Sequence, residues 1–145
     1  MLAPVIVSSR GSAMRGHETL AKAVTIALFA LVGWAICGTI MAIGPLFLSM
    51  QTTLIVHAVG ATLAFAALSA VYFRRFAFTS PLPTALIFLA IVVGLDVFLV
   101  APVFVGDFGM FASPIGTWIP FALIFAATLL TGLAVPRGAP GAHPA

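Results

Sequence analysis

Long apolar runs alternate with short polar segments along the 145 residues of the chain. A helix needs about 20 mostly apolar residues to cross the roughly 30 Å hydrocarbon core of a membrane. Four segments meet this requirement, and we predict a transmembrane helix over each of them: residues 23–43, 54–73, 81–105 and 115–135. The pattern therefore predicts an all-α, polytopic membrane protein whose four transmembrane helices form an up-down bundle.

Helix-breaking and helix-starting residues stand at the ends of these segments. Gly44 and Pro45 follow the first segment, and we expect them to end its helix because proline lacks a backbone N–H. Ser80 is a suitable N-cap for the third segment, and Pro81 follows at the first helical position, where no N–H is needed. Because the connections between segments are short, consecutive helices are expected to be antiparallel neighbours.

The two ends of the chain are more polar than the four segments. We expect residues 1–22 to be a mobile cytoplasmic segment, and residues 136–145, rich in proline, glycine and alanine, to be a disordered cytoplasmic tail. A basic stretch precedes the first apolar segment, as in a signal peptide, but this apolar run is longer than the roughly 7 to 15 residues typical of one. We therefore expect the segment to be retained as a helix.

The composition supports a membrane location. Hydrophobic residues make up 63% of the chain and charged residues only 6%, whereas soluble domains contain about 25% charged residues. The net charge is +3, but the basic residues form no stripe and no recognition motif, so nucleic acid is not an expected partner. The first expected partner is the lipid bilayer, and the chain is expected to be an integral membrane protein.

The basic residues all fall on one side of the predicted membrane. They are Arg10, Arg15 and Lys22 before the first segment, Arg74 and Arg75 between the second and third, and Arg137 after the fourth. The other two connections, residues 44–53 and 106–114, contain no lysine or arginine. Because cytoplasmic loops carry the excess of basic residues, we expect both termini in the cytoplasm and the protein in the plasma (inner) membrane.

Small residues recur at every fourth position of the second segment, which places them along one side of the helix. Such ladders let transmembrane helices approach each other closely. Shorter pairs with the same spacing occur in the first and fourth segments. The residues we expect to pack helices together are Ala58, Thr62, Ala66 and Ala70, with Gly33 near Cys37 in the first segment and Thr128 near Gly132 in the fourth.

Asp96 lies near the middle of the third segment, where an ionised carboxylate costs at least a few kcal/mol and is usually partnered. His57 is the one candidate cation inside a segment. At about 1.5 Å per residue, Asp96 lies about 22 Å and His57 about 24 Å from the inner boundary, so their depths match. We expect them to form an intramembrane polar pair, as an ion pair or a neutral hydrogen bond. Two roles fit such a pair: a clamp between helices, or a proton relay or cation site.

Two prolines fall inside the apolar segments. Pro102 frees the carbonyl of Phe98 from its helical hydrogen bond, and Pro120 frees that of Gly116. A carbonyl released in lipid must find a partner or face the bundle interior. The two positions therefore indicate helix kinks, which are either structural or part of a polar vestibule in the outer half of the bundle.

Catalytic motifs of soluble enzymes are missing from the sequence: there is no G-x-S-x-G, no Walker loop, no H-E-x-x-H and no cysteine pair. The single cysteine, Cys37, is expected to be a small packing residue. Only His57 among the histidines lies inside a segment, so ligation of a haem by two histidines would require a dimer. We expect no cofactor and no metal, and we do not expect an enzyme.

Three stretches carry a family resemblance: FRRFAFTSPLPTALIF, LDVFLVAPVF and SPIGTWIPFALIFAATLLTG, which fall within residues 73–132. They resemble a set of small four-helix membrane proteins of bacteria. The resemblance implies a location in a bacterial plasma membrane and implies no activity.

Together these features favour a non-enzymatic accessory or oligomer-forming membrane component. In this interpretation the ladder of the second segment packs a partner, and Asp96 sets the register of two helices. The partner would be a second copy of the chain or another membrane protein. The alternative is a small proton-coupled transporter or channel subunit that uses Asp96 and His57.

Overall fold

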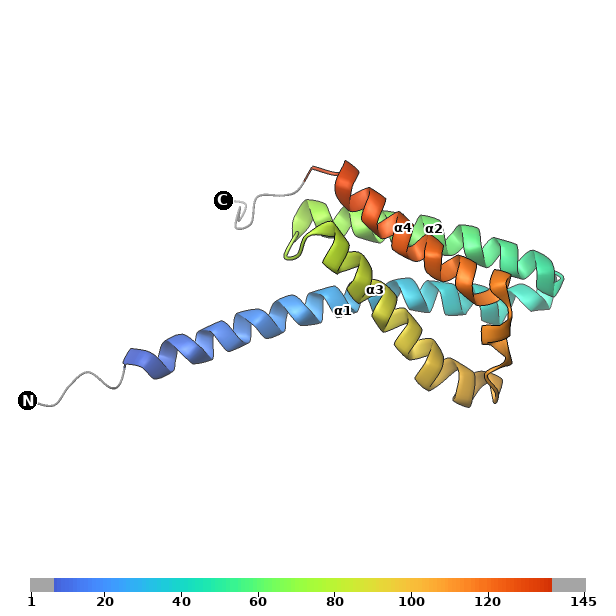
Figure 1. The fold of residues 1–145 in the computed structure, drawn as a ribbon, viewed down its shortest axis with the longest axis horizontal. Helices are drawn as coiled ribbons and strands as arrows, with labels where there is room; N and C mark the ends of the chain where they lie inside the picture. The colour runs from blue at the N-terminus through green and yellow to red at the C-terminus, as the bar shows by residue number, and fades with distance from the viewer. Residues whose placement is uncertain (1–6, 137–145) are drawn as a thin grey trace, which may run out of the picture.

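The structure, a computed structural model, describes residues 7–136. Its elements in chain order are α1 (Val7–Phe47), α2 (Met50–Arg75), α3 (Pro81–Leu95), the π-helix η1 (Asp96–Val105), the 3₁₀ turn η2 (Gly109–Ala112), the π-helix η3 (Pro114–Trp118) and α4 (Ile119–Ala134). No strand occurs among these residues. Figure 1 shows the four long helices and their connections.

Four helices are long and apolar enough to cross a membrane: Arg15–Phe47, Met50–Arg75, Pro81–Val105 and Pro114–Ala134. Each contains, to within a residue, one of the segments selected from the sequence. In the last two, a π-helix continues directly into or out of the α-helix, so that each span is a single helical rod. The prediction of an all-helical chain with four candidate membrane spans is therefore confirmed.

The first helix does not end where the sequence predicts. It continues through Gly44 and Pro45 to Phe47, because the missing N–H of Pro45 removes only one bond within the last turn. The N–H of Leu48 still donates to the carbonyl of Gly44 at 2.9 Å. Residues 7–22, expected to be a mobile segment, belong to the same helix, while residues 1–6 and 137–145, with Arg137 and most of the expected tail, lie outside the described residues.

The order of the helices around the bundle differs from their order in the chain. α1 packs against α2 and α3, and α4 also packs against α2 and α3. The backbones of α2 and α3 make little direct contact, so these two helices lie diagonally across the bundle. Because the chain reverses direction at each connection (Figure 1), α1 runs parallel to α3, and α2 runs parallel to α4. The expectation that consecutive helices are neighbours holds for α1–α2 and α3–α4 but is wrong for α2–α3.

The core at the end that holds the α2–α3 connection is built on Tyr72, which is fully buried. Its ring meets those of Phe29, Phe73 and Phe88 edge to face, with centroids 5.1–6.1 Å apart, a favourable arrangement for aromatic pairs. The Tyr72 hydroxyl shares a 3.1 Å hydrogen bond with the hydroxyl of Thr79, which is itself hydrogen-bonded to the hydroxyl of Thr84 at 2.6 Å. These contacts fasten the diagonal connection between α2 and α3.

α1 is much longer than the bundle. Its 41 residues would extend about 62 Å, roughly twice the hydrocarbon thickness of a membrane. Lys22 marks where α1 meets the α2–α3 connection, because its Nζ lies 5.8 Å from the centre of the Phe78 ring. The part of α1 before this point projects beyond the other helices (Figure 1).

Candidate functional site

Asp96 stands where α3 changes from an α-helix to the π-helix η1. Its N–H is shared between the carbonyls of Val92 and Val93. Farther along η1, Pro102 has no N–H to donate, and the wider π turns give the backbone a different set of bonds, such as that from Gly106 N to Ala101 O at 2.8 Å. Irregular turns of this kind inside helices are frequent at functional sites. The sequence indicates a kink here, but not the π-helix that begins at Asp96.

The hydrogen-bond partner of Asp96 is Trp34 of α1. The indole Nε1 of Trp34 donates to Oδ1 of Asp96 at 2.9 Å, and both side chains are half-buried. A buried tryptophan N–H needs such an acceptor, and a carboxylate needs donors. The bond therefore joins the parallel helices α1 and α3 in the middle of their spans. The second oxygen, Oδ2, has no hydrogen bond among the described residues.

His57 does not pair with Asp96, contrary to the expected contact. It lies on α2, diagonally across the bundle from α3, and its Nδ1 is buried without a hydrogen-bond partner among the described residues. The matching depths of the two residues placed them at the same level of the bundle but gave no information on which helices are neighbours. Trp34 is the partner that the depth argument missed, although its position in the middle of an apolar segment was a usable signal.

The ladder of small residues on α2 is only half-buried. Ala58, Thr62, Ala66 and Ala70 all fall in this class, whereas the fully buried side of α2 carries Ala61, Phe65 and Ser69. Two ladder residues, Ala58 and Thr62, line an apolar groove of about 490 Å³ between α2 and the start of the last span, where Ile115 and Ile119 form the opposite wall. Half of the ladder thus borders an open groove along the helix.

The other expected packing residues lie inside the bundle. A Cβ on Gly33 would lie 2.5 Å from Cζ of Phe65, and a Cβ on Gly132 would lie 2.5 Å from Cε2 of Phe73. Both glycines therefore allow an aromatic ring of α2 to approach the backbone of a neighbouring helix. Thr128 is fully buried on α4, and its Oγ1 has no hydrogen-bond partner among the described residues.

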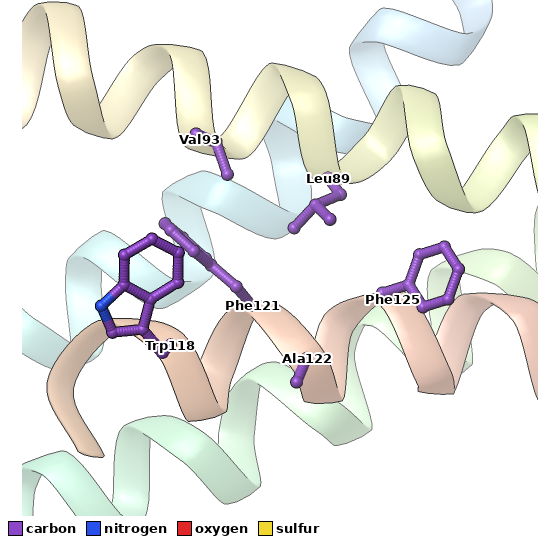
Figure 2. A pocket seen from close by; sticks show the side chains of 6 residues that line it. All are labelled: Leu89, Val93, Trp118, Phe121, Ala122 and Phe125. Atoms are coloured by element: carbon purple, nitrogen blue, oxygen red, sulfur yellow. The ribbon is translucent and has the colours of Figure 1, made fainter. Parts of the chain in front are cut away.

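A second apolar groove, of about 320 Å³, lies between α3 and α4. In Figure 2, Leu89 and Val93 of α3 face Phe121 across the groove, and the small Ala122 leaves its floor open between Phe121 and Phe125. Trp118 closes one end; its Nε1 donates to the carbonyl of Phe111 at 2.9 Å. The lining offers no other polar side chain.

Pro120 lies in the first turn of α4, directly after the π-helix η3. The N–H of Ile119 donates to the carbonyl of Pro114. Thr117 Oγ1 donates to Met110 O at 2.7 Å, which ties η2 to the start of the last span. Both prolines expected to produce kinks therefore lie in or beside π-helical turns. Sequence patterns do not distinguish such turns from a simple bend.

Three basic residues gather at one end of the bundle, and Arg15 lies on the part of α1 that projects beyond the other helices. Lys22 pairs with Glu18 at 2.6 Å on α1 and lies over Phe78, while Arg74 and Arg75 occupy the last turn of α2. Arg137 lies outside the described residues. The structure thus places Lys22, Arg74 and Arg75 at the same end of the bundle.

The described candidate residues provide a hydrogen bond between helices and points of close helix approach. Within residues 7–136, no group of three or more His, Cys, Asp or Glu side chains is placed to hold a metal ion. Cys37, one turn after Trp34 on α1, is a buried free thiol. The chain matches no protein-family model, no curated protein and no solved structure, so the candidate site is defined by geometry alone.

Proposed function

We propose that this chain is a non-enzymatic, multi-pass protein of the bacterial plasma membrane that serves as an accessory or oligomer-forming component of a membrane assembly. The observation that supports the proposal most strongly is the hydrogen bond that the mid-span carboxylate forms between two helices. Asp96 accepts a hydrogen bond from Trp34 and so joins α1 to α3. Polar contacts of this kind hold transmembrane helices together where the lipid offers no other partner.

The groove beside the ladder supports the oligomer-forming part of the proposal. Ala58 and Thr62 border it, and the exposed side chains of Val59 and Leu63 extend its apolar surface toward the surroundings of the bundle. Small residues on an open surface allow another helix to approach closely. The grouping of Lys22, Arg74 and Arg75 at one end supports an orientation with both termini in the cytoplasm.

The first test compares wild type with Asp96→Asn in sealed liposomes containing a pH-sensitive dye. If Asp96 is a clamp, the variant folds with a loss of about 1 kcal/mol or less, and proton flux is the same for both proteins. Asp107→Asn is the matched control, because Asp107 bonds only to the backbone of its own outer connection. Proton flux in wild type that disappears in Asp96→Asn alone would contradict the proposal.

The second test fills the groove on α2. The double variant Ala58→Leu and Thr62→Leu is expected to lower the number of copies per complex, counted by single-molecule photobleaching in native lipid discs. Val56→Leu is the control, because Val56 is exposed on the same helix and does not line the groove. An unchanged copy number in the double variant would show that the ladder is not part of the surface through which copies associate.

A proton-coupled transporter or channel subunit is the second candidate, and one observation favours it. The Nδ1 atom of His57 is buried without a hydrogen-bond partner among the described residues, and intramembrane histidines occur in the proton relays of pumps and transporters. In that case, His57→Gln would abolish flux together with Asp96→Asn. The liposome experiment therefore decides between the two functions.

A further inference from the structure

The hydrogen bonding of Asp96 is half complete. Trp34 satisfies Oδ1, and Oδ2 has no hydrogen bond among the described residues. A carboxylate within the hydrocarbon region is costly unless it is paired, and one neutral indole does not balance a full negative charge. The environment of Asp96 within this chain is therefore suited to a second, cationic partner.

The described part of the chain does not supply that cation. Lys22, Arg74 and Arg75 lie at the end of the bundle where α3 begins, and Asp96 is 15 residues farther along the rod, about 22 Å away. His57 lies across the bundle on α2. The four apolar segments, residues 23–43, 54–73, 81–105 and 115–135, contain no lysine or arginine. A second copy inserted in the same direction would therefore not bring one to this depth either.

The C-terminal halves of α1 and of the α3–η1 rod run apart from each other (Figure 1). The Trp34–Asp96 bond joins the two rods before these ends. On α1 beyond Trp34, Ile36 is 40% exposed, and a Cβ on Gly38 would meet nothing within 4 Å. On η1, Phe98 is 81% and Phe104 71% exposed. The C-terminal halves of α1 and η1 therefore carry exposed apolar side chains, and the half-paired carboxylate lies at the start of η1.

From this charge complementarity we infer that the outer halves of α1 and η1 bind a transmembrane helix of another membrane protein, which carries a lysine or arginine at the depth of Asp96. The inference rests on the proposed function as an accessory component and names the partner of that component. The basic side chain pairs with Oδ2 while Trp34 holds Oδ1. A basic residue in the middle of a membrane also requires a counter-charge. Asp96 would supply the negative charge for the partner, and the partner would supply the positive charge for Asp96.

The test uses the full-length protein in liposomes with synthetic probe helices. The host probe is a polyleucine helix of about 20 residues, labelled with an acceptor fluorophore, and the protein carries the donor. Four versions are compared: no central charge, a central lysine, a central glutamate, and a lysine moved about 10 Å toward one end. Association is measured by energy transfer at increasing peptide-to-lipid ratio.

We expect the central-lysine helix to bind wild type about tenfold more tightly than the other three, and to lose this advantage in Asp96→Asn but not in Asp107→Asn. Trp34→Phe is the control for misfolding, because it breaks the same interhelical bond but leaves the carboxylate of Asp96 in place. We expect this variant to keep the preference for the central-lysine helix. Equal binding of all four probes to wild type would overturn the inference, as would an unchanged lysine preference in Asp96→Asn.

Self-association is the competing outcome. If donor-labelled and acceptor-labelled copies of the chain associate through this face, unlabelled Asp96→Asn protein will compete as well as wild type and the lysine probe will show no advantage, which would overturn the inference. If the lysine preference fails while the Ala58→Leu and Thr62→Leu double variant lowers the copy number as expected, the proposed function stands. Failure of both would remove it.

Discussion

The carboxylate of Asp96 and the indole of Trp34 each need a hydrogen-bond partner inside the bundle. An indole N–H inside a bundle lacks an acceptor, and a carboxylate in the same place lacks a donor. Their 2.9 Å bond meets both needs and joins two helices that are adjacent in space but not in the chain. The bond gives Asp96 a role in helix packing, and Oδ2, which has no hydrogen bond among the described residues, is the atom that our inference assigns to a partner.

Removing the donor tests the stabilising part of this explanation. In Trp34→Phe, Oδ1 of Asp96 loses its hydrogen bond, and we expect the free energy of unfolding to fall by about 1–2 kcal/mol. Unfolding in mixed micelles, followed by circular dichroism, measures the change. Trp118→Phe is the control, because the Trp118 indole donates to the backbone of η2 and the side chain is 58% exposed. Equal losses in the two variants would argue against a special role for the Trp34 bond.

Close helix approach at Gly33 gives a second test at the residue scale. In Gly33→Ala, the new Cβ would lie 2.5 Å from the ring of Phe65, so we expect a loss of about 1–3 kcal/mol from overpacking. Gly38→Ala lies five positions later on the same helix, where a Cβ meets nothing within 4 Å, and should be neutral or slightly stabilising. The same unfolding assay compares the two, and a neutral Gly33→Ala would show that α1 and α2 pack less closely than described.

The sequence identified Asp96 as the central residue but not its partner. Depth along a helix follows from residue counting, which is why Asp96 and His57 could be placed at one level. The direction in which a side chain faces depends on which helices are neighbours, and residue counting carries no such information. Trp34 lies 12 residues after Lys22, about 18 Å deep, so the same arithmetic would have admitted it as a candidate.

At the scale of elements, the apolar pattern located the helices well and their irregularities poorly. Pro45 fails to end α1 because a proline in the last turn costs only one hydrogen bond. Pro102 and Pro120 lie in or beside π-helical turns, which depend on how the neighbouring backbone is paired. Residue identity at one position therefore indicates an interruption without specifying its form.

The end of α2 offers a test of backbone conformation. Ala77 has a φ of 43°, in the left-handed region where a side chain is unfavourable by roughly 1–2 kcal/mol. We expect Ala77→Gly to raise the free energy of unfolding by about 1 kcal/mol. Ala67→Gly, within α2, should lower it by about the same amount. A destabilising Ala77→Gly would show that the α2–α3 connection takes another conformation.

At the scale of the whole molecule, the number of spans could be predicted but their spatial order could not. Hydrophobic length decides how often the chain crosses a membrane, whereas the order of helices in the bundle is decided by side-chain fit. The cluster around Tyr72 and Phe88 brings α2 and α3 together across the diagonal through their rings. This contact between distant residues leaves no trace in the periodicity of either segment.

The orientation in the membrane is a prediction of the charge pattern, and cysteine labelling in intact cells tests it. In a Cys37→Ala background, Ala112→Cys should react with a membrane-impermeant maleimide added outside. Ser80→Cys, in the α2–α3 connection beside the basic residues, should react only after the cells are permeabilised. The reverse pattern would show that the protein has the opposite orientation, and reaction of both cysteines in intact cells would indicate dual insertion.

The most direct test of the account is the nuclear magnetic resonance spectrum of the two indole N–H groups in lipid nanodiscs, because the chain has only two tryptophans. We predict that Asp96→Ala moves the Trp34 signal and leaves the Trp118 signal in place, since Trp118 bonds to the backbone of Phe111. We also predict that neither signal shifts between about pH 5 and pH 9, as expected of a structural clamp. A Trp34 signal that titrates in this range only while Asp96 is present would show a carboxyl group exchanging protons with water, and would contradict the account.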